Sequence, residues 1–271
     1  MWLSYILGDA AIVGVLLLLV RKMELRPRLA LPWVLFISPS CLWLAFRLSS
    51  YVPGLSIALQ LLAAFSLSIA FSVLAVLFLF FRDPGRTPPP EPGTILSPAD
   101  GKIIYIKMLD DDTFPIAVKK GRNVPLTEFT GDFFPLRQGL QVGIMMSYLD
   151  VHINRAPIAG KLERIKRIPG GFHSLKHMDS LLENERVFSV IAGPEVRVGI
   201  VQIASRLVRR IVPFVKEGDN VRQGDRIGLI RFGSQVDLLI PDRDSVEVIV
   251  RVGDYVKAGL TVLGRFKGPV A

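Results

Sequence analysis

The sequence contains one cysteine, Cys41, and three histidines among 271 residues. One cysteine cannot form an intrachain disulfide, and it supplies too few thiolates for a cysteine-based zinc or iron–sulfur site. Three histidines also leave little room for a histidine-rich metal centre. We therefore expect a protein without a metal site.

Charged residues are scarce in the first third of the chain. Residues 1–81 hold five of the 33 basic and two of the 24 acidic side chains, although the net charge is +9. Half of all residues are hydrophobic and the mean hydropathy is +0.42, which a purely soluble protein does not reach. The chain is thus predicted to have a membrane part and a soluble part.

Three apolar runs predict a membrane anchor over residues 1–81. Residues 55–81 carry no formal charge, residues 29–46 are uncharged but contain Pro32 and Pro39, and residues 2–20 carry one charge, Asp9. About 20 apolar residues cross a bilayer, so three transmembrane helices are expected. The first run lacks the basic start and small-residue cleavage site of a signal peptide, which favours its retention. Asp9 is either a functional carboxylate or a residue that reaches the interface.

The basic residues predict the orientation of the anchor. Four of them, at positions 21, 22, 26 and 28, lie between the first two runs, whereas residues 48–54 are uncharged. The positive-inside rule then puts the amino terminus outside and everything after residue 81 on the cytoplasmic face of the cell membrane. A basic domain held at a bilayer faces anionic lipid, so a nucleic-acid partner is not expected.

A proline-rich linker at residues 82–93 separates the anchor from a second part, residues 94–271. The linker has five prolines in twelve residues, so it cannot continue a helix and should be extended. The second part is dominated by short β-branched runs between glycine, aspartate and proline, which predicts a mainly β fold with few helices. One helix is expected at residues 204–212.

A short pattern, G-D-x-V-x-x-G, occurs at residues 218–224 and again at 253–259, and an apolar run follows each copy. It predicts two hairpins with tight Gly-Asp turns and inward valines, within a compact β-sandwich or barrel. The pattern resembles biotinyl and lipoyl carrier domains, although neither copy has their attachment lysine. This resemblance suggests one alternative function, a non-enzymatic adaptor of a membrane transport system.

Five segments, in order along the chain, carry a second and more specific resemblance. They read L-S-P-A-D-G-K at 96–102, L-D-V-H-I-N-R-A-P-I-A-G at 149–160 and L-I-R-F-G-S-Q-V-D at 229–237, with F-R-D-P at 81–84 and E-N-E-R at 183–186. Together they resemble the phosphatidylserine decarboxylase proenzyme family in its shorter form. The resemblance implies a membrane-bound, pyruvoyl-dependent carboxy-lyase that converts phosphatidylserine to phosphatidylethanolamine and CO2.

The resemblance implies that the proenzyme cuts itself between Gly233 and Ser234, leaving fragments 1–233 and 234–271 associated. Ser234 would become the pyruvoyl group, which takes the substrate amine as a Schiff base, and no external cofactor is needed. Without the other segments, Gly-Ser between two apolar runs is an ordinary turn. The same chemistry on an ether lipid, an archaetidylserine, fits the segments equally well.

The resemblance also implies a relay in which Asp100 orients His152, and His152 removes the proton of Ser234. From the residues alone, His152 is a buried structural histidine or a base, and Asp100 is a turn aspartate. Longer relatives carry a second histidine where this chain has Arg155. His152 would then serve both cleavage and decarboxylation, unless His173 or His177 helps.

Two basic clusters are candidates for phosphate binding or for attraction to anionic lipid. They are residues 161, 164, 166 and 167, and residues 206, 209 and 210. Phe133 and Phe134 either enter the bilayer or belong to the core. A homodimer is also expected, from the resemblance and from an open sheet edge.

Overall fold

The computed structural model describes residues 2–22, 27–49, 51–52, 54, 56–110, 113–119, 122–125, 138–170, 184–194, 196–204, 210–231 and 234–267. The chain forms two compact units, Met1–Arg82 and Asp83–Ala271. Each unit is described by itself below.

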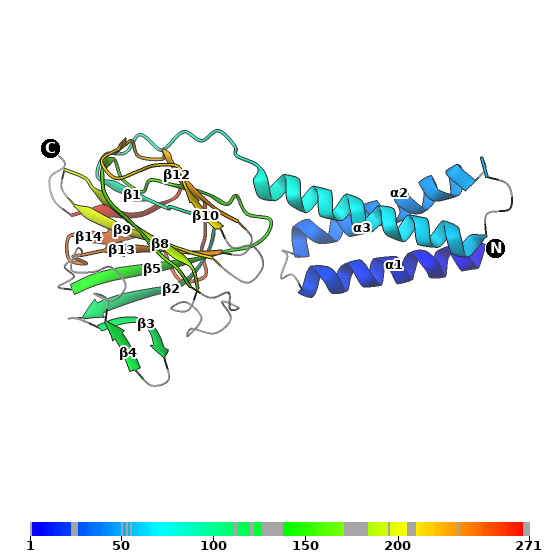
Figure 1. Ribbon diagram of the computed structural model, residues 1–271, viewed down its shortest axis with the longest axis horizontal. Helices are drawn as coiled ribbons and strands as arrows, with labels where there is room; N and C mark the ends of the chain where they lie inside the picture. Colours follow the sequence, from blue (N-terminus) through cyan, green and yellow to red (C-terminus); the bar gives the residue numbers. More distant parts are fainter. Residues whose placement is uncertain are drawn as a thin grey trace. The chain divides into compact units, whose positions relative to one another are not determined.

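The first unit contains three helices, α1 (Trp2–Lys22), α2 (Pro27–Ser49) and α3 (Ile57–Phe81) (Figure 1). All three are long and apolar enough to cross a membrane, as the three apolar runs predict. Pro32 and Pro39 lie inside α2 without ending it. Ser56 caps α3, because its hydroxyl accepts a hydrogen bond from the Leu59 amide at 3.4 Å.

Polar side chains join the helices to one another. The Ser38 hydroxyl on α2 donates to the Asp9 carboxylate on α1 at 2.7 Å, and the Tyr5 hydroxyl on α1 donates to Gln60 on α3 at 2.5 Å. Among apolar helices such bonds supply specific association, since lipid competes for every apolar contact. Asp9 therefore has a partner inside the bundle.

The second unit is built from strands, as the short β-branched runs predict, and the mainly β fold class is confirmed. The strands are β1 (Thr94–Leu96), β2 (Gly101–Asp110), β3 (Thr113–Lys119), β4 (Arg122–Pro125), β5 (Gln138–Met146), β6 (Ile153–Arg155), β7 (Gly160–Ile168), β8 (Arg186–Ala192), β9 (Arg197–Ala204), β10 (Arg210–Pro213), β11 (Asn220–Val221), β12 (Arg226–Arg231), β13 (Ser234–Ile240), β14 (Val246–Val248), β15 (Tyr255–Val256) and β16 (Val262–Phe266).

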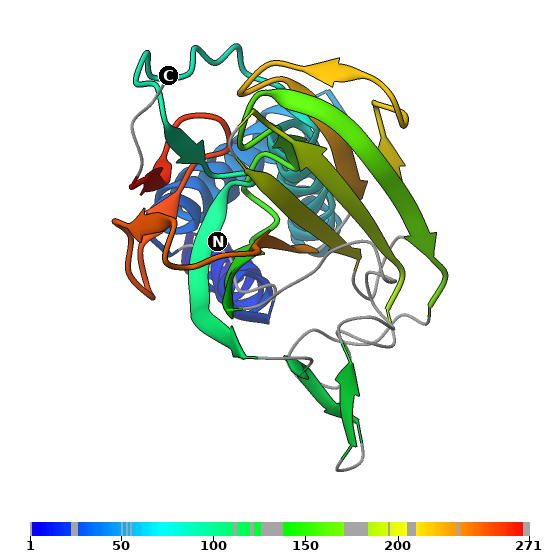
Figure 2. The same cartoon turned by 90° about the vertical axis from the view of Figure 1, so that its left-hand side faces the viewer.

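An eight-stranded sheet, in the order β11-β7-β8-β9-β13-β5-β2-β15, curls around the core (Figure 2). Two three-stranded sheets, β10-β12-β6 and β1-β16-β14, complete the unit, and β3 and β4 form a separate hairpin. Alternate residues of β13 (Val236, Leu238 and Ile240) belong to the core. The central strand β13 is therefore held by β5 and β9 at its edges and by apolar packing on one face.

The two G-D-x-V-x-x-G copies form the expected turns. Gly218 and Gly253 have φ angles of 94° and 100°, which favour glycine. In each turn the aspartate accepts a bond from an amide three residues earlier, and the valines, Val221 and Val256, are buried. The structure thus confirms the carrier-like hairpins.

Each hairpin lies against a second repeated segment that the sequence analysis missed. Strand β15 pairs with the beginning of β2, and β11 pairs with the beginning of β7. The segments that receive them read S-P-A-D-G-K-I at 97–103 and A-P-I-A-G-K-L at 156–162. The two segments also bond each other reciprocally, from the Leu96 amide to the Pro157 carbonyl and from the Arg155 amide to the Pro98 carbonyl, both at 2.9 Å. The unit therefore contains the same arrangement of turn and paired strand twice.

The helix expected at residues 204–212 is wrong where the structure describes it. Ala204 ends β9 and Arg210–Pro213 form β10, which pairs with β12 from Arg210↔Arg231 to Pro213↔Gly228. Residues 205–209 lie outside the described part. The β-branched pair Ile211-Val212 favours a strand, and sheet pairing overrides the helical spacing of the apolar residues.

Gly160→Ala tests the close approach of the beginning of β7 to the end of β8. A Cβ at Gly160 would lie 2.2 Å from the Ala192 carbonyl oxygen, so the substitution should destabilise the β unit by about 1–3 kcal/mol. Gly85→Ala is the control, since nothing lies within 4 Å of a Cβ there. Circular dichroism on heating in detergent should show a lower melting temperature for the first variant alone. Equal melting temperatures would contradict the described packing.

Candidate active site

Ser234 lies at the beginning of the central strand, immediately after a break between two sheets. Strand β12 ends at Arg231, and the backbone of Ser234 pairs with Met146 of β5 and with Ala204 of β9. Gly233 and the side chain of Ser234 lie outside the described part. The backbone of residue 234 is thus held on both sides by neighbouring strands.

The segment from Met146 to His152 lies on both sides of this break. At one end Met146 pairs with Ser234, and at the other the His152 carbonyl accepts a bond from the Ile230 amide at 3.3 Å. Strand β6, which follows His152, pairs with β12 from Leu229↔Ile153 onward. Main-chain pairing therefore brings His152 and the 231–234 connection into one region.

The His152 imidazole is fully buried, and its Nδ1 lies 2.8 Å from the Asp150 carbonyl oxygen. A carbonyl oxygen can only accept a hydrogen bond, so Nδ1 carries the proton. In the neutral ring Nε2 then carries no proton and can act as an acceptor. The structure holds His152 in the tautomer that a base requires.

A turn before His152 is fixed by the Asp150 carboxylate. That carboxylate accepts bonds from the amide and hydroxyl of Ser147, at 2.7 and 2.8 Å, and from the Tyr255 hydroxyl. Because Tyr255 belongs to β15, the second carrier-like hairpin supports the turn that carries His152. The sequence analysis did not identify Asp150 or Tyr255 as site residues.

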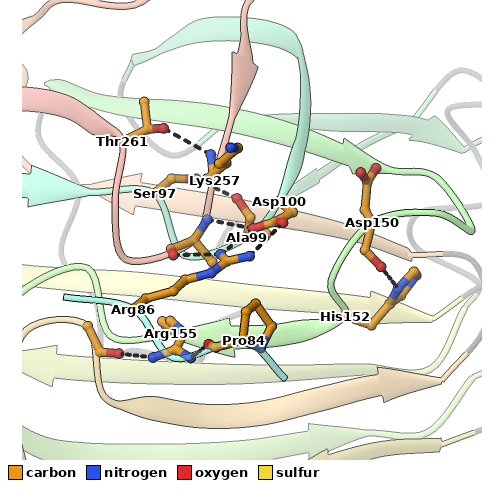
Figure 3. A network of polar contacts seen from close by, with 12 residues as sticks. Pro84, Arg86, Ser97, Ala99, Asp100, Asp150, His152, Arg155, Lys257 and Thr261 are labelled. Atoms are coloured by element: carbon orange, nitrogen blue, oxygen red, sulfur yellow. Dashed lines mark hydrogen bonds and ion pairs between the residues drawn. The ribbon is translucent and has the colours of Figure 1, made fainter. Parts of the chain in front are cut away.

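Asp100 lies apart from His152 and has other partners (Figure 3). Its carboxylate accepts two bonds from Arg86, at 2.5 and 2.8 Å, and one from the Ala258 amide at 2.7 Å. Asp100 precedes β2 and Ser234 begins β13, and both strands flank β5. They are therefore two strand spacings, about 10 Å, apart. Within the described part of the chain, His152 is not among the partners of Asp100, so its orienting role stays a prediction.

The linker is bound to the β unit through ion pairs, of which Arg86–Asp100 is buried. Both side chains of the Arg86–Asp100 pair are almost fully buried, and Arg86 also donates to the Ala258 carbonyl at 2.7 Å. Asp83 pairs with Arg155 at 3.2 Å and with Arg226 at 2.5 Å. The extended linker predicted from its prolines is thus held by charges, which the proline content did not indicate.

Arg155, at the position where the resemblance implies a second histidine in longer relatives, is part of this attachment. Its guanidinium donates to the Pro84 carbonyl at 3.1 Å and to the Gly224 carbonyl at 2.9 Å. Burial lowers the pKa of Arg155, and the neighbouring Asp83 carboxylate opposes that effect. The described contacts give Arg155 a binding role toward the linker.

Two further polar groups lie close to the candidate site. Asn154, two residues after His152, accepts a bond from Gln202 at 2.7 Å, and both side chains are buried. On the face of β13 away from the core, Gln235 and Asp237 bond the Tyr105 hydroxyl. Burial raises the pKa of Asp237 to about 6, against the effect of its hydrogen bonds.

The remaining candidates divide into described and undescribed residues. His173, His177, Phe133, Phe134, Arg206 and Arg209 lie outside the described part, and Arg210 is exposed in β10. In the first basic cluster, on β7, Arg164 pairs with Glu217 at 3.8 Å and Arg167 with Glu185 at 3.2 Å. Its role in phosphate binding stays a prediction.

Comparison with known proteins agrees with this arrangement. A sequence profile of the phosphatidylserine decarboxylase family matches residues 73–264. A provisionally named archaetidylserine decarboxylase proenzyme of Methanothermobacter thermautotrophicus is 41% identical over 199 residues, which cover 73% of this chain and 84% of the relative. The phosphatidylserine decarboxylase proenzymes of Azorhizobium caulinodans and Erythrobacter litoralis are 38% and 43% identical. These matches cover 79% and 73% of this chain, and 86% and 75% of the relatives.

The fold and the site define a mainly β enzyme unit that follows apolar helices suited to a membrane anchor. The chain belongs to the phosphatidylserine decarboxylase family, a family of carboxy-lyases. The resemblance inferred from the five segments is confirmed. This membership also decides against the non-enzymatic adaptor.

Arg86→Met tests whether the Arg86–Asp100 ion pair stabilises the β unit more than a surface ion pair does. The substitution leaves the buried Asp100 carboxylate without its cation, which should cost about 3–5 kcal/mol. Arg265→Met is the matched control, because the Arg265–Glu91 pair is half exposed and is worth about 0–1 kcal/mol. Melting temperatures should fall by about 10 °C in the first variant and by about 2 °C or less in the second. Similar losses would show that the linker pair is not buried in solution.

Proposed function

We propose that this chain is a phosphatidylserine decarboxylase proenzyme that cuts itself between Gly233 and Ser234. The observation that carries the proposal is the position of the 146–152 segment, which pairs with Ser234 at one end and with Ile230 at the other. This pairing supports a role for the buried His152 imidazole, whose Nε2 carries no proton in the tautomer described above, at the connection that is to be cut. A base and a nucleophile within reach are the requirement for such a reaction.

In the proposed cleavage, His152 removes the proton of the Ser234 hydroxyl, and the oxygen attacks the Gly233 carbonyl carbon. The amide becomes an ester as the nitrogen takes up a proton. Loss of the Ser234 α-proton then expels the Gly233 carboxylate and leaves dehydroalanine. One water molecule converts dehydroalanine to the keto-capped end of residue 234 and releases ammonia. The proposed products are fragments 1–233 and 234–271, without an external cofactor.

Two features of the described residues fit a keto group at position 234. Strands β5 and β9 hold the backbone there on both sides, so a new chain end would remain in the sheet. His152 is buried, which keeps bulk water from its ring. The pyruvoyl group would supply a ketone that binds the substrate amine and accepts the electrons of the broken carbon–carboxylate bond.

His152 is also proposed to return a proton to the substrate α-carbon after CO2 leaves. An imidazole can take up a proton in one step of a reaction and give it back in another. Asp100 is proposed as a positioning residue rather than a direct partner of the ring. Through Arg86 and the Ala258 amide it joins the linker to the second carrier-like hairpin, which also carries Tyr255.

The proposed substrate is phosphatidylserine in the membrane that the three helices enter. The catalytic unit is proposed to lie on the cytoplasmic face, from the four basic residues between the first two helices. Archaetidylserine is the second candidate, since one similar relative is named for it. Release of CO2 from vesicles of each lipid would separate the two. A homodimer stays a prediction.

Ser234→Ala should leave the chain whole. Intact mass in denaturing solvent should show two fragments for the wild type and one chain of 30.0 kDa for the variant, because alanine has no hydroxyl to attack Gly233. A wild-type preparation that releases CO2 while remaining one chain would overturn the proposal. Cleavage of the Ser234→Ala chain would instead refute the nucleophile.

His152→Ala should slow self-cleavage by about 10²–10⁴-fold, the usual contribution of a general base. The rate is measured as appearance of the 234–271 fragment after synthesis in vitro. Tyr5→Phe is a control, because it alters a buried hydrogen bond of the first unit. Cleavage at the wild-type rate without His152 would assign the base to another residue.

A further inference from the structure

A buried polar cluster lies directly after Ser234, on the face of β13 opposite the core. Its members are Tyr105 on β2, Gln141 on β5, and Gln235 and Asp237 on β13. The last three are almost completely buried. The cluster therefore joins three neighbouring strands, of which β13 would start at the cut.

The Tyr105 hydroxyl is the centre of the cluster. It donates to Asp237 at 2.8 Å and accepts bonds from Gln235 at 2.6 Å and from Gln141 at 3.2 Å. Gln235 and Gln141 also donate to the two Asp237 oxygens, at 2.8 and 2.7 Å. The ring lies over Gly143, where a Cβ would approach it to 2.4 Å. The position of this tyrosine is thus closely defined.

Apolar packing alone does not define the register of β13. Side chains alternate across a strand, so a shift by one residue would expose the core residues, whereas a shift by two would preserve the apolar face. A two-residue shift would bring Leu239 to the position of Asp237 and leave Tyr105 and Gln141 without their acceptor. The polar cluster distinguishes these registers, because the Tyr105 hydroxyl and both Asp237 oxygens have hydrogen-bond partners in the observed one.

Before cleavage the register has a second constraint, the short connection from Arg231 of β12 to Ser234. Cleavage after Gly233 removes it and turns the beginning of β13 into a chain end, and free ends tend to fray. A two-residue shift moves the chain end by about 7 Å, beyond the hydrogen-bond reach of His152.

We propose that the Tyr105–Gln141–Gln235–Asp237 cluster holds the newly made chain end in register beside His152. Its members are positioning residues, and their role begins when the chain is cut. The inference rests on the proposed self-cleavage and adds the means by which the product of that step stays in place.

Tyr105→Phe tests the inference in cut and uncut chains. The variant keeps the ring and removes three hydrogen bonds, so the amides of residues 236–240 should exchange hydrogen about 10-fold faster in the cut enzyme. In an uncut Ser234→Ala background, the same change should alter exchange less than about 2-fold, because the connection to β12 remains. Tyr5→Phe is the matched control, since it removes a buried tyrosine bond elsewhere.

Gln235→Met provides a second variant of similar volume and should give the same difference between cut and uncut chains. In both variants kcat for decarboxylation should fall about 10-fold, while the rate of self-cleavage stays within about 2-fold. If hydrogen exchange accelerated equally in cut and uncut chains, or changed in neither, the inference would be overturned. A wild-type chain that is never cut would instead refute the proposed function. An intact-mass measurement would show such a chain as a single species.

Discussion

Main-chain pairing around the beginning of β13 is the constraint on which the rest of the site depends. Residue 234 is bonded to strands on both sides, and Ile230, just before it, is bonded to His152. Ladder hydrogen bonds of a central strand define positions to within a fraction of an ångström, which loops do not. The connection between β12 and β13 and the neighbouring His152 are therefore positioned by sheet geometry, and side chains refine that arrangement.

Much of this organisation can be predicted from the sequence, because it depends on local patterns. The apolar runs that form α1 to α3 and the β-branched runs of the second unit are local patterns, and so are the two Gly-Asp turns. Ser234 and His152 were identified as candidates through a resemblance between ordered segments. The prediction of a helix at 204–212 was wrong because the strand there is stabilised by pairing with β12, and the sequence of residues 204–212 does not reveal that pairing.

The contacts missed by the sequence analysis join residues far apart in the chain. Arg86 forms a hydrogen bond with Ala258, which is 172 residues away in the sequence, and Tyr105 forms one with Asp237, which is 132 residues away. A charged residue in a proline-rich linker and polar residues within apolar strands were the available signals. Burying such a residue alone costs free energy, so each one indicates that a partner exists. Which residue is the partner depends on the topology of the whole fold.

The two repeated segments, 97–103 and 156–162, can be compared with each other because they form the same turn. In S-P-A-D-G-K-I the fourth position is Asp100, and in A-P-I-A-G-K-L it is Ala159, yet both turns receive their hairpins through the same main-chain bonds. A carboxylate is thus unnecessary for building this turn. The shape of the turn therefore does not require Asp100, and its carboxylate is left to attract the Arg86 guanidinium of the linker.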